Sequence, residues 1–550
     1  MFLIIKQKRV KCLLTTNTIY EMLTQGGLCV MRGNVMYRIK FSLIISSLMF
    51  VFLSADADTD ITNDVYNLSN KTSDNTGNFY IENKRTYNTW PKNFTQTYAN
   101  GTLIFGNKQK QVGNGNIHFG GSGWQGGLIG YIGATFKAKE VYLTGTLGAG
   151  NSFGTGGGAA FTFNATENLT ADKFTLNLNI AGTQNNHFKA TGQTITFKNS
   201  TLNADHNGFT LDMKTTGRDM SFDNTKVSFG GMVTLNSAGN LNFTNQSSLA
   251  SRGNVIDIKA TNDIIFDDKS SLTVQSGGLT TDAYINFEAK NITLHNINIT
   301  ATQGKAQVNF KASDKLDINK LNLNFDLITA ASYSNAIFEG KTINIKNSSL
   351  KTTPGASTKN ANISFKAQGD ITLDNVDINT HLGTSGNGGR VDFVAQNLKH
   401  TGTIVIGRDG TGTSDEFLDS GIWDAVVDFS KVSGVVSIGN LKARKGVVHL
   451  NKDFSASSLE IRRTTGNPTT DFDMPEGGSA KFGSINVEAG GGSGSGHNAS
   501  LQFNKDGFMA NTTLTIGTLK LGKIAGFYAS NIETSNIQNL ILDHNARAEF

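Results

Sequence analysis

The sequence predicts an all-β protein, a right-handed parallel β-helix (solenoid) with coils of about 25 residues and an N-terminal cap. Three observations support this class. Large apolar residues recur at intervals of about 22 to 29 residues, a period typical of solenoids. Around them polar and apolar residues alternate, as in strands with one buried face. Only 4 prolines, 17% charged residues and 61 glycines favour many short strands joined by polar turns.

The repeat unit is clearest at residues 186–204. Aligned without a gap, Phe188 to Asn199 lies over Met213 to Asn224. One coil cannot bury its own apolar face, so coils stacked about 4.8 Å apart are expected to merge equivalent residues into a core. The first apolar position of the unit then predicts one inward column, made of Phe136, Phe163, Phe188, Met213, Leu235, Ile258, Phe287, Phe310, Phe338, Phe365 and Phe393.

Two further columns follow within each unit. The second apolar column contains Phe197, Phe222, Phe243, Phe266, Leu294, Ile318, Ile345 and Leu373. Two residues later an asparagine recurs, with Asp268 and Lys320 as departures, at Asn199, Asn224, Asn245, Asn296, Asn347 and Asn375. Asparagine tolerates the left-handed turn conformation, and stacked asparagines form hydrogen-bonded ladders. We therefore expect a turn at this position of each coil.

Residues 1–57 are interpreted as a leader whose core, residues 31–57, is a Sec-type signal peptide. A basic start is followed by the apolar run Phe41 to Leu53, which is too short for a membrane anchor. Ala55 and Ala57 form an A-x-A site, so cleavage is expected after Ala57. The residues before this core leave two alternatives open, a start at an internal methionine or an extended leader.

Removal of the leader changes the charge and the cysteine content of the chain. Both cysteines, Cys12 and Cys29, lie in it, and a cysteine-free body fits an exported bacterial protein. The formal net charge of the whole chain is +5, but the leader holds seven basic and two acidic residues, so the rest has 42 of each. A neutral body gives no electrostatic reason to bind nucleic acid.

Residues 58–133 are expected to form an N-terminal cap and a glycine-rich segment, because a stack of strands needs its first edge covered. The glycine-rich segment has the small-xxx-small spacing of packed membrane helices, which makes it a candidate membrane or packing segment. Its apolar stretch is far shorter than a span, so a loop that enters the first coil is favoured. The residues with this spacing are Gly123, Gly126, Gly127, Gly130 and Ala134.

The remaining chain divides into residues 134–406, a regular array of repeats, and residues 407–550, a looser continuation. The last residues read as an interrupted coil without a cap, so we expect a fragment, a truncated chain or the first part of a larger protein. Extra residues, as at 381–389, are expected to form surface loops. The segment 408–416 lacks the ligand spacing of a calcium loop, and a plain turn is favoured.

No catalytic, cofactor-binding or metal site is predicted. The histidines are scattered without a metal-ligand spacing, and no nucleotide or nucleophile motif is found. A β-helix enzyme acting on acidic polysaccharide would need converging carboxylates on one outer face. The pairs Asp219/Asp223 and Asp263/Asp267 are expected two coils apart, about 10 Å, and are interpreted as solvated surface groups. We therefore expect no enzyme and no cofactor.

The repeat Phe365-Lys-Ala-Gln-Gly-Asp-Ile-Thr-Leu-Asp-Asn375 shows a pattern that recurs in the array. A phenylalanine stands two residues before an alanine, and two apolar residues that alternate with polar ones precede the asparagine. With the signal peptide and the cysteine-free body, these repeats resemble the passenger region of a bacterial autotransporter (type V secretion). Over most of residues 58–550 the repeat pattern is similar to that of the toxin-like outer-membrane proteins related to the vacuolating cytotoxin of gastric bacteria. The resemblance implies export to the cell surface or outer membrane, or secretion. The outer-membrane translocator barrel of such proteins is not read in this chain.

These observations predict a surface-displayed or secreted, toxin-like passenger that contacts a host-cell or other bacterial surface without catalysis. The first alternative is a pore-forming or vacuolating toxin, although the cytotoxin has a longer apolar segment nearer its mature N-terminus. The second alternative is a polysaccharide lyase or hydrolase. Within the repeat unit, the register predicts that Phe188, Ile195 and Phe197 point inward and that Lys189, Thr196 and Lys198 face water.

Overall fold

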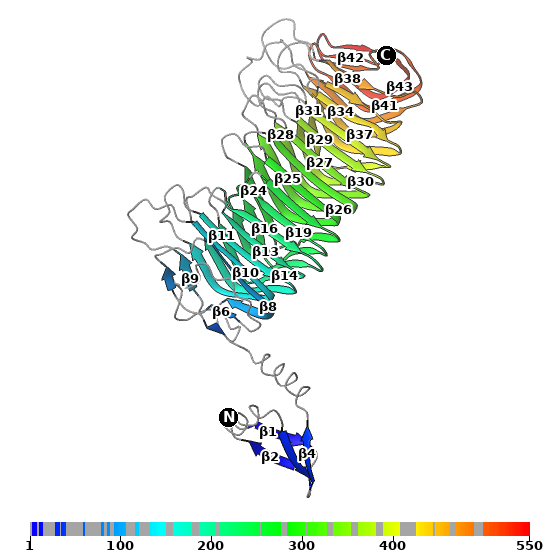
Figure 1. Cartoon of the computed structure of the whole chain (residues 1–550). Coiled ribbons are helices and arrows are strands. Elements are labelled where there is room, and N and C mark those ends of the chain that lie inside the picture. The colour runs from blue at the N-terminus through cyan, green and yellow to red at the C-terminus, as the bar shows by residue number, and fades with distance from the viewer. Residues whose placement is uncertain are drawn as a thin grey trace, which may run out of the picture.

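The computed structural model is a stack of parallel strands that forms a β-solenoid of about 12 turns, with about 26 residues in each turn (Figure 1). The predicted fold class is confirmed, and every element among the described residues is a strand. Before residue 131 the structure describes only separate strands of 2 to 13 residues. From 131 onward it describes the chain except for residues 150–157, 179–185, 205–207, 254, 277–282, 303–304, 327–333, 354–360, 381–388, 407–424, 444–445, 463–468 and 489–498.

Each coil has three sides, which we number in chain order. Strands confined to the first side are β11 (Gly158–Ala165), β13 (His187–Gly192), β16 (Thr210–Thr215), β19 (Val233–Ser237), β22 (Val255–Ala260), β27 (Ser334–Gly340), β29 (Ala361–Ala367), β31 (Gly389–Ala395), β34 (Ala425–Val432), β36 (Gly446–His449), β38 (Thr469–Asp473), β40 (Ser500–Phe503), β42 (Gly526–Tyr528) and β44 (Arg547–Glu549).

Short strands form the second and third sides of the middle coils. Those on the second side are β14 (Thr194–Lys198), β17 (Met220–Asp223), β20 (Leu241–Thr244), β23 (Asp263–Phe266) and β32 (Leu398–His400). Those on the third side are β15 (Thr201–Ala204), β18 (Lys226–Phe229), β21 (Ser248–Ser251), β24 (Ser271–Ser276) and β33 (Thr403–Ile406).

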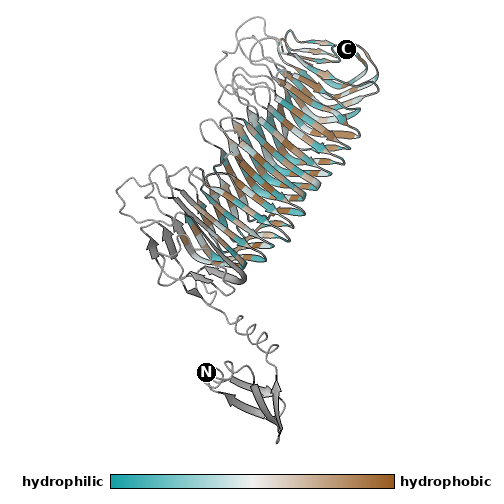
Figure 2. Cartoon of the chain, viewed as in Figure 1, coloured by the Kyte–Doolittle hydropathy of each residue, from teal (hydrophilic) through white to brown (hydrophobic). Residues whose placement is uncertain are grey.

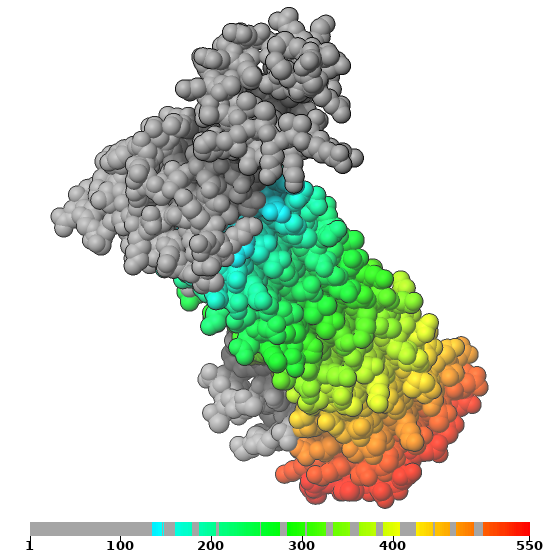
Figure 3. Space-filling view, turned by 90° about the horizontal axis from the view of Figure 1, so that it is seen from below, coloured from blue at the N-terminus to red at the C-terminus, as the bar shows by residue number. Residues whose placement is uncertain are grey.

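Longer strands continue around one or more corners. They are β10 (Tyr131–Ala149), β12 (Asn168–Leu178), β25 (Ala283–Ala301), β26 (Ala306–Asp326), β28 (Thr342–Thr353), β30 (Ile371–Thr380), β35 (Val435–Ala443), β37 (Asp453–Arg462), β39 (Ser479–Glu488), β41 (Met509–Leu521) and β43 (Ile532–Leu542). Parallel pairing continues from β31 to β34 and on to β44, so the looser continuation at 407–550 belongs to the same stack (Figure 3).

Strands before residue 131 extend the parallel pairing into the predicted cap region. There β8 (Asn93–Phe105) and β9 (Asn116–Phe119) pair with β10. In turn, β6 (Phe79–Ile81) pairs with β8 and with β5 (Thr59–Asp60), and β7 (Arg85–Tyr87) pairs with β9. Residues 1–57 contain two antiparallel strand pairs, β1 (Leu3–Gln7) with β2 (Val10–Leu14) and β3 (Leu28–Arg32) with β4 (Val35–Ile39).

Hydrophobic and hydrophilic residues alternate along the strands (Figure 2). Burial alternates in the same way, as the period-two pattern predicts. In the repeat unit, Phe188, Ile195 and Phe197 are fully buried, whereas Lys189 and Lys198 face outward. The core is therefore a set of columns that run along the stack, because each inward residue lies on the equivalent residue of the next coil.

Phenylalanines form two continuous stacks in this core. In the first inward column, the rings from Phe287 through Phe310, Phe338, Phe365 and Phe393 to Phe429 are 4.9 to 5.2 Å apart between centroids. In the second column, Phe222, Phe243 and Phe266 lie closer, at 4.4 and 4.2 Å. Ring stacking stabilises the core beyond the contribution from burial. Replacement of one ring therefore removes contacts with both neighbouring coils.

The gap-free alignment of the repeat unit is wrong in its first strand. In the structure Phe188 pairs with Leu211, and Ala190 pairs with Met213, so Ala190 occupies the position predicted for Phe188. The turn after Thr215 is two residues longer than the turn after Gly192, and the registers agree again on the second side. The Phe188 ring still contacts that of Phe163, 5.7 Å away between centroids.

The asparagine column has the predicted left-handed conformation. The φ angles of Asn199, Asn224, Asn245, Asn296, Asn347 and Asn375 all lie between 47° and 55°, and the departure Lys320 also has a positive φ of 62°. The predicted ladder is confirmed in part. Asn224 donates to Asn199 at 2.8 Å, and Asn375 donates to Asn347 at 3.1 Å. Other members bond to neighbouring carboxylates or backbone carbonyls instead.

A column of buried hydroxyls, which the repeat pattern did not reveal, lies one or two residues after these asparagines. Ser200, Thr225 and Ser247 are almost fully buried. The Thr225 amide donates to Ser247 Oγ at 3.0 Å, and the Ser247 hydroxyl donates to the Thr244 carbonyl at 2.6 Å. These hydroxyls satisfy backbone groups that the corner takes out of the strand ladder.

Replacement of Asn347 by alanine is expected to lower the free energy of unfolding by about 2 kcal/mol. The left-handed conformation of residue 347 costs alanine about 1 to 2 kcal/mol, whereas asparagine adopts it readily. The substitution also removes the hydrogen bond from Asn375. Asn347→Gly should cost less, because glycine adopts this φ freely. Urea unfolding followed by circular dichroism measures both variants. A glycine variant less stable than the alanine variant would contradict this account.

Candidate functional site: a polar row on the first side

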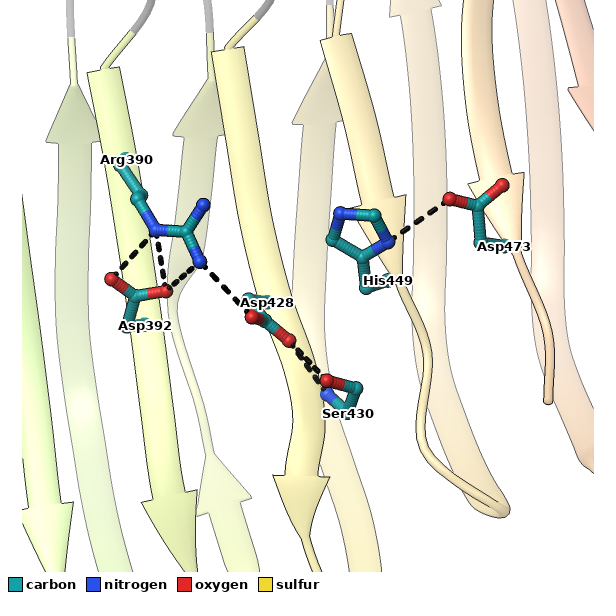
Figure 4. Close-up of polar contacts among 6 residues, drawn as sticks. All are labelled: Arg390, Asp392, Asp428, Ser430, His449 and Asp473. Carbon is teal, nitrogen blue, oxygen red and sulfur yellow. Dashed lines mark hydrogen bonds and ion pairs between the residues drawn. The ribbon is translucent and has the colours of Figure 1, made fainter.

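A row of polar side chains crosses the outer surface of the first side at β31, β34, β36 and β38 (Figure 4). The register places Asp392 beside Asp428, Asp428 beside His449, and His449 beside Asp473. Each residue comes from a different coil, so the row exists only in the folded stack. We call these residues, with Arg390 and Ser430, the polar row.

Arg390 joins the first two carboxylates of the polar row. Its Nε lies 2.7 Å from Asp392 Oδ1 and 2.8 Å from Asp392 Oδ2, and its guanidinium donates to Asp428 Oδ2 at 3.1 Å. The hydrogen bonds to Asp392, followed by the charges of both carboxylates, raise the pKa of Arg390 despite partial burial. The guanidinium therefore acts as a fixed cation that ties β31 to β34.

Asp428 is the most buried acid in the row, with 8% of its side chain exposed. Burial alone would raise the pKa of this carboxyl group. Hydrogen bonds from the Ser430 hydroxyl at 2.6 Å and its amide at 3.0 Å, with the charges of His449 and Arg390, outweigh burial, and the pKa of Asp428 is lowered. Asp428 is therefore an ionised, well-satisfied carboxylate at neutral pH.

His449 and Asp473 form the other end of the row. His449 Nδ1 lies 2.9 Å from Asp473 Oδ2, and both side chains are about two-fifths exposed. This bond fixes the orientation of the imidazole ring relative to β38. Beside them on the outer face, Val426 pairs with Val447, which gives the row a small apolar border.

The polar row can hold charges in a fixed pattern, but its carboxylates already have partners. Among the residues that the structure describes, no three His, Cys, Asp or Glu side chains converge as a metal site. The geometry therefore favours structural bracing of four successive coils.

The acidic pairs considered in the sequence lie on the second side and are bonded to asparagines of neighbouring coils. Asp219 accepts a hydrogen bond from the backbone amide of Asn240 at 2.7 Å, and Asp263 accepts from the Asn291 side chain at 2.8 Å. Asp223 accepts from Asn245 at 2.7 Å, and Asp267 accepts from the Asn245 backbone at 2.8 Å. Two coils separate the pairs, as predicted.

Among the histidines that the structure describes, one lies in the core. His400 pairs with Leu373 at the end of the second inward column and is 2% exposed. Its Nε2 lies 2.8 Å from the Val376 carbonyl, and its buried Nδ1 has no partner in this structure. Desolvation lowers the pKa of His400, and the Val376 carbonyl and the Asp377 charge oppose that effect only in part. The ring is therefore neutral, with Nε2 donating to the carbonyl.

Most of the residues singled out in the sequence for export or membrane contact lie outside the described residues. Ala55, Ala57, Gly123, Gly126, Gly127 and Gly130 belong to that group, while Ala134 lies in β10. In the described part of the chain no helix has the length and apolar character needed to cross a membrane.

Sequence reasoning missed the polar row and His400. Arg390, Asp428 and Asp473 are distant in sequence, and the connections between their strands differ in length, so no fixed spacing reveals the row. His400 could have been found, because the second column continues from Leu373 to His400 in the strand pairing. The interval from Leu373 to His400 is 27 residues, the same as the interval from Ile318 to Ile345, so the repeat spacing itself points to position 400.

The fold and its surface define a β-solenoid whose outer face is built from paired charges and amides. Residues 127–186 match the family model described as "Putative vacuolating cytotoxin". This segment contains the whole of β10, β11 and β12, which form coils near the start of the described stack. The chain is thus similar to that family over these coils. No curated protein and no solved structure matches the chain.

Replacement of Arg390 by glutamine is expected to lower the free energy of unfolding by about 1 to 2 kcal/mol. The change removes the cation that bonds to the buried Asp428 carboxylate, and the exposed position of Arg390 reduces the effect. The matched control is Lys366→Gln, which breaks an exposed pair with Glu339 and should change stability by less than about 0.5 kcal/mol. Equal losses in urea unfolding would show that the polar row does not brace the coils.

Proposed function

We propose that the chain is an exported, toxin-like β-solenoid, displayed on the cell surface or secreted, that acts by contacting a host-cell or other bacterial surface without catalysis. The observation that carries the proposal is the match of residues 127–186 to the family described as "Putative vacuolating cytotoxin". These residues form coils of the solenoid. A rigid stack with one side chain pattern repeated over many coils offers an extended surface for binding another macromolecule.

The bonding of the outer carboxylates supports a role without catalysis. Asp219 and Asp263 accept hydrogen bonds from asparagine N–H groups of neighbouring coils. Hydrogen bonds from Ser430, with the charges of His449 and Arg390, outweigh burial and lower the pKa of Asp428, whereas a general acid would need a carboxyl group whose pKa is raised. If the chain does not act on glycans, acidic polysaccharides incubated with it should give no cleavage products, with or without calcium. Release of unsaturated or reducing ends would overturn this part of the proposal.

Binding to cells tests the proposal directly. The fluorescently labelled chain, with the leader removed, should bind epithelial cells or bacterial cells saturably, and unlabelled chain should compete for the same sites. A matched control is the Phe197→Asp variant, whose coils should be disrupted because Phe197 is fully buried. Binding that does not saturate on either cell type, or that equals the binding of the control, would refute a specific surface interaction.

Pore formation is the second candidate, because the family match begins at residue 127, within the glycine-rich segment. If this segment inserts into lipid, the chain should release dye from liposomes, and the double change Gly126→Val and Gly130→Val should abolish release by removing the small-residue spacing. Liposomes that stay intact at concentrations saturating cell binding would leave surface contact as the function.

A further inference from the structure

We propose that the outer face of the first side binds a neutral oligosaccharide across β25, β26, β27 and β29, in the middle of the stack (Figure 1). This inference rests on the proposed function and names the chemistry of the surface that the chain contacts. Two adjacent outward rows, with one aromatic and five amide side chains, form a site that we call the amide patch. Its members are Tyr284, Gln307, Asn335 and Asn362 in one row and Asn286 and Asn309 in the other.

The amide patch gathers hydrogen-bonding groups from four successive coils. Tyr284 lies beside Gln307 in the register. Asn335 and Asn362 follow on the next two coils, at about 4.8 Å for each coil. Each side-chain amide has an acceptor oxygen and two donor hydrogens. Because sugar hydroxyl groups also donate and accept hydrogen bonds, this row is complementary to the edge of a sugar ring.

Two amides of the patch are enclosed although they occupy outward positions. Asn286 is 4% exposed, and Asn309 is 2% exposed. The Asn286 side chain donates to Asp257 Oδ1 at 2.9 Å, and Gln307 donates to Asn309 Oδ1 at 3.2 Å. These bonds orient the amides before a ligand arrives, which reduces the side-chain entropy that binding would otherwise cost.

The side-chain oxygen of Asn335 lacks a hydrogen bond that a ligand can supply. This Oδ1 atom is buried and has no partner in this structure, although the residue as a whole is partly exposed. Buried polar atoms are nearly always paired, so an unpaired one requires an explanation. Rotation about the last side-chain bond exchanges Oδ1 with Nδ2, and no hydrogen bond to Oδ1 opposes this rotation. A sugar hydroxyl that donates to this oxygen completes its bonding.

Tyr284 adds an aromatic surface at one end of the patch. Its side chain is 39% exposed, which leaves part of the ring accessible to a ligand. One face of a pyranose ring carries C–H groups, and these pack against an aromatic ring while the hydroxyl groups at the ring edge reach the amides. An exposed ring beside oriented amides is therefore the arrangement that a sugar requires.

The charges around the amide patch favour a neutral ligand. The patch contains no Asp, Glu, Lys or Arg, and Asp257 beside it is paired with Lys259 at 3.3 Å. The adjoining outward row alternates in sign on three coils, through Glu288, Lys311 and Glu339. Acidic and basic ligands therefore gain no net attraction at this surface.

Isothermal titration calorimetry with the 550-residue chain tests the proposal. The neutral probes are chitotriose, N-acetyllactosamine and maltotriose, and at least one of them should bind. Sialyllactose and a heparin tetrasaccharide should bind more weakly. Tyr284→Ala should weaken the binding of the neutral probe by about tenfold, whereas Tyr284→Phe should stay within about threefold of the parent. Binding of no neutral probe, or tighter binding of the charged probes, would overturn the proposal.

Asn335→Leu separates binding from stability. The change removes an unpaired buried atom, so the midpoint of thermal unfolding should not fall, while the affinity for the same probe should fall by about tenfold. The matched controls are Gln502→Leu and Tyr528→Ala, which lie in the same outward row on later coils and should keep the parent affinity. A probe that binds Tyr284→Ala and Asn335→Leu as tightly as the parent would place its site elsewhere and overturn the proposal.

Competition on cells distinguishes this inference from the proposed function. The neutral probe, at a saturating concentration, should displace the labelled chain from the cells that it binds, and Tyr284→Ala should bind those cells more weakly. Saturable binding that neither the probe nor Tyr284→Ala reduces would refute the amide patch as the contact surface. An absence of saturable binding would refute the proposed function instead.

Discussion

Phe197→Asp is expected to lower the free energy of unfolding by about 5 kcal/mol or more, the largest effect that we predict for a single residue. The Phe197 ring is fully buried and lies 5.6 Å from that of Phe222. Truncation of a core phenylalanine costs about 3 to 5 kcal/mol, and a carboxyl group placed there has no hydrogen-bond partner. Urea unfolding, followed at several wavelengths, should show loss of the cooperative transition or a large decrease in its midpoint.

The control for this prediction must be an outward position on the same strand. Lys198 faces water, but the register places it between Asp172 and Asp223, so Lys198→Asp is not a neutral control. Aspartate there would stack three carboxylates and cost up to about 1 kcal/mol. Lys198→Thr avoids this repulsion and should change stability by less than about 0.5 kcal/mol. If Lys198→Thr and Phe197→Asp were equally harmless, the inward and outward assignments would be wrong.

Acidification is expected to destabilise the chain through His400. The folded state lowers the pKa of His400, so the unfolded state binds more protons as the pH falls below about 6.5, the ordinary value for histidine. Stability is therefore complete above that pH and falls by up to about 1.4 kcal/mol per unit until the folded-state pKa is reached. A protonated ring would place a second, unpartnered N–H donor at Nδ1, and Asp377 offsets that charge only in part.

His400→Leu should remove this part of the pH dependence, because leucine fits a column whose preceding member is Leu373. The variant should be more stable than the parent at acidic pH, with a smaller gain at neutral pH. His544→Gln is the control, since His544 is exposed on the last coil. Thermal unfolding between neutral and mildly acidic pH measures the slopes. Equal slopes for the parent and His400→Leu would exclude His400 as the titrating group.

Much of the fold could be predicted because the repeat carries the same information many times. Residues such as Phe197 and Phe222 recur in register, and Asn199 marks a corner that the backbone confirms with a φ of 49°. One error arose where a turn changes length. The two extra residues after Thr215 shift Phe188 to another column, and periodicity alone cannot locate such an insertion because both alignments keep the alternation of apolar residues.

The candidate site was less predictable for a physical reason. Arg390, Asp428 and His449 become neighbours only through strand pairing between coils, and connections of different lengths separate them along the chain. A sequence pattern shows how many residues separate two positions along the chain. Which side chains lie beside each other on neighbouring coils depends on the strand register instead.

Cysteine cross-linking tests the stacked register, the claim on which the rest of the account depends, most directly. Paired residues on neighbouring coils lie about 4.8 Å apart, within disulfide range. In a chain with Cys12 and Cys29 replaced by serine, Lys189→Cys with Asp212→Cys should form a disulfide on mild oxidation, because these residues pair. Lys189→Cys with Lys214→Cys, the pair that the gap-free alignment favours, should stay reduced. Cross-linking of the second pair instead of the first would contradict the structure.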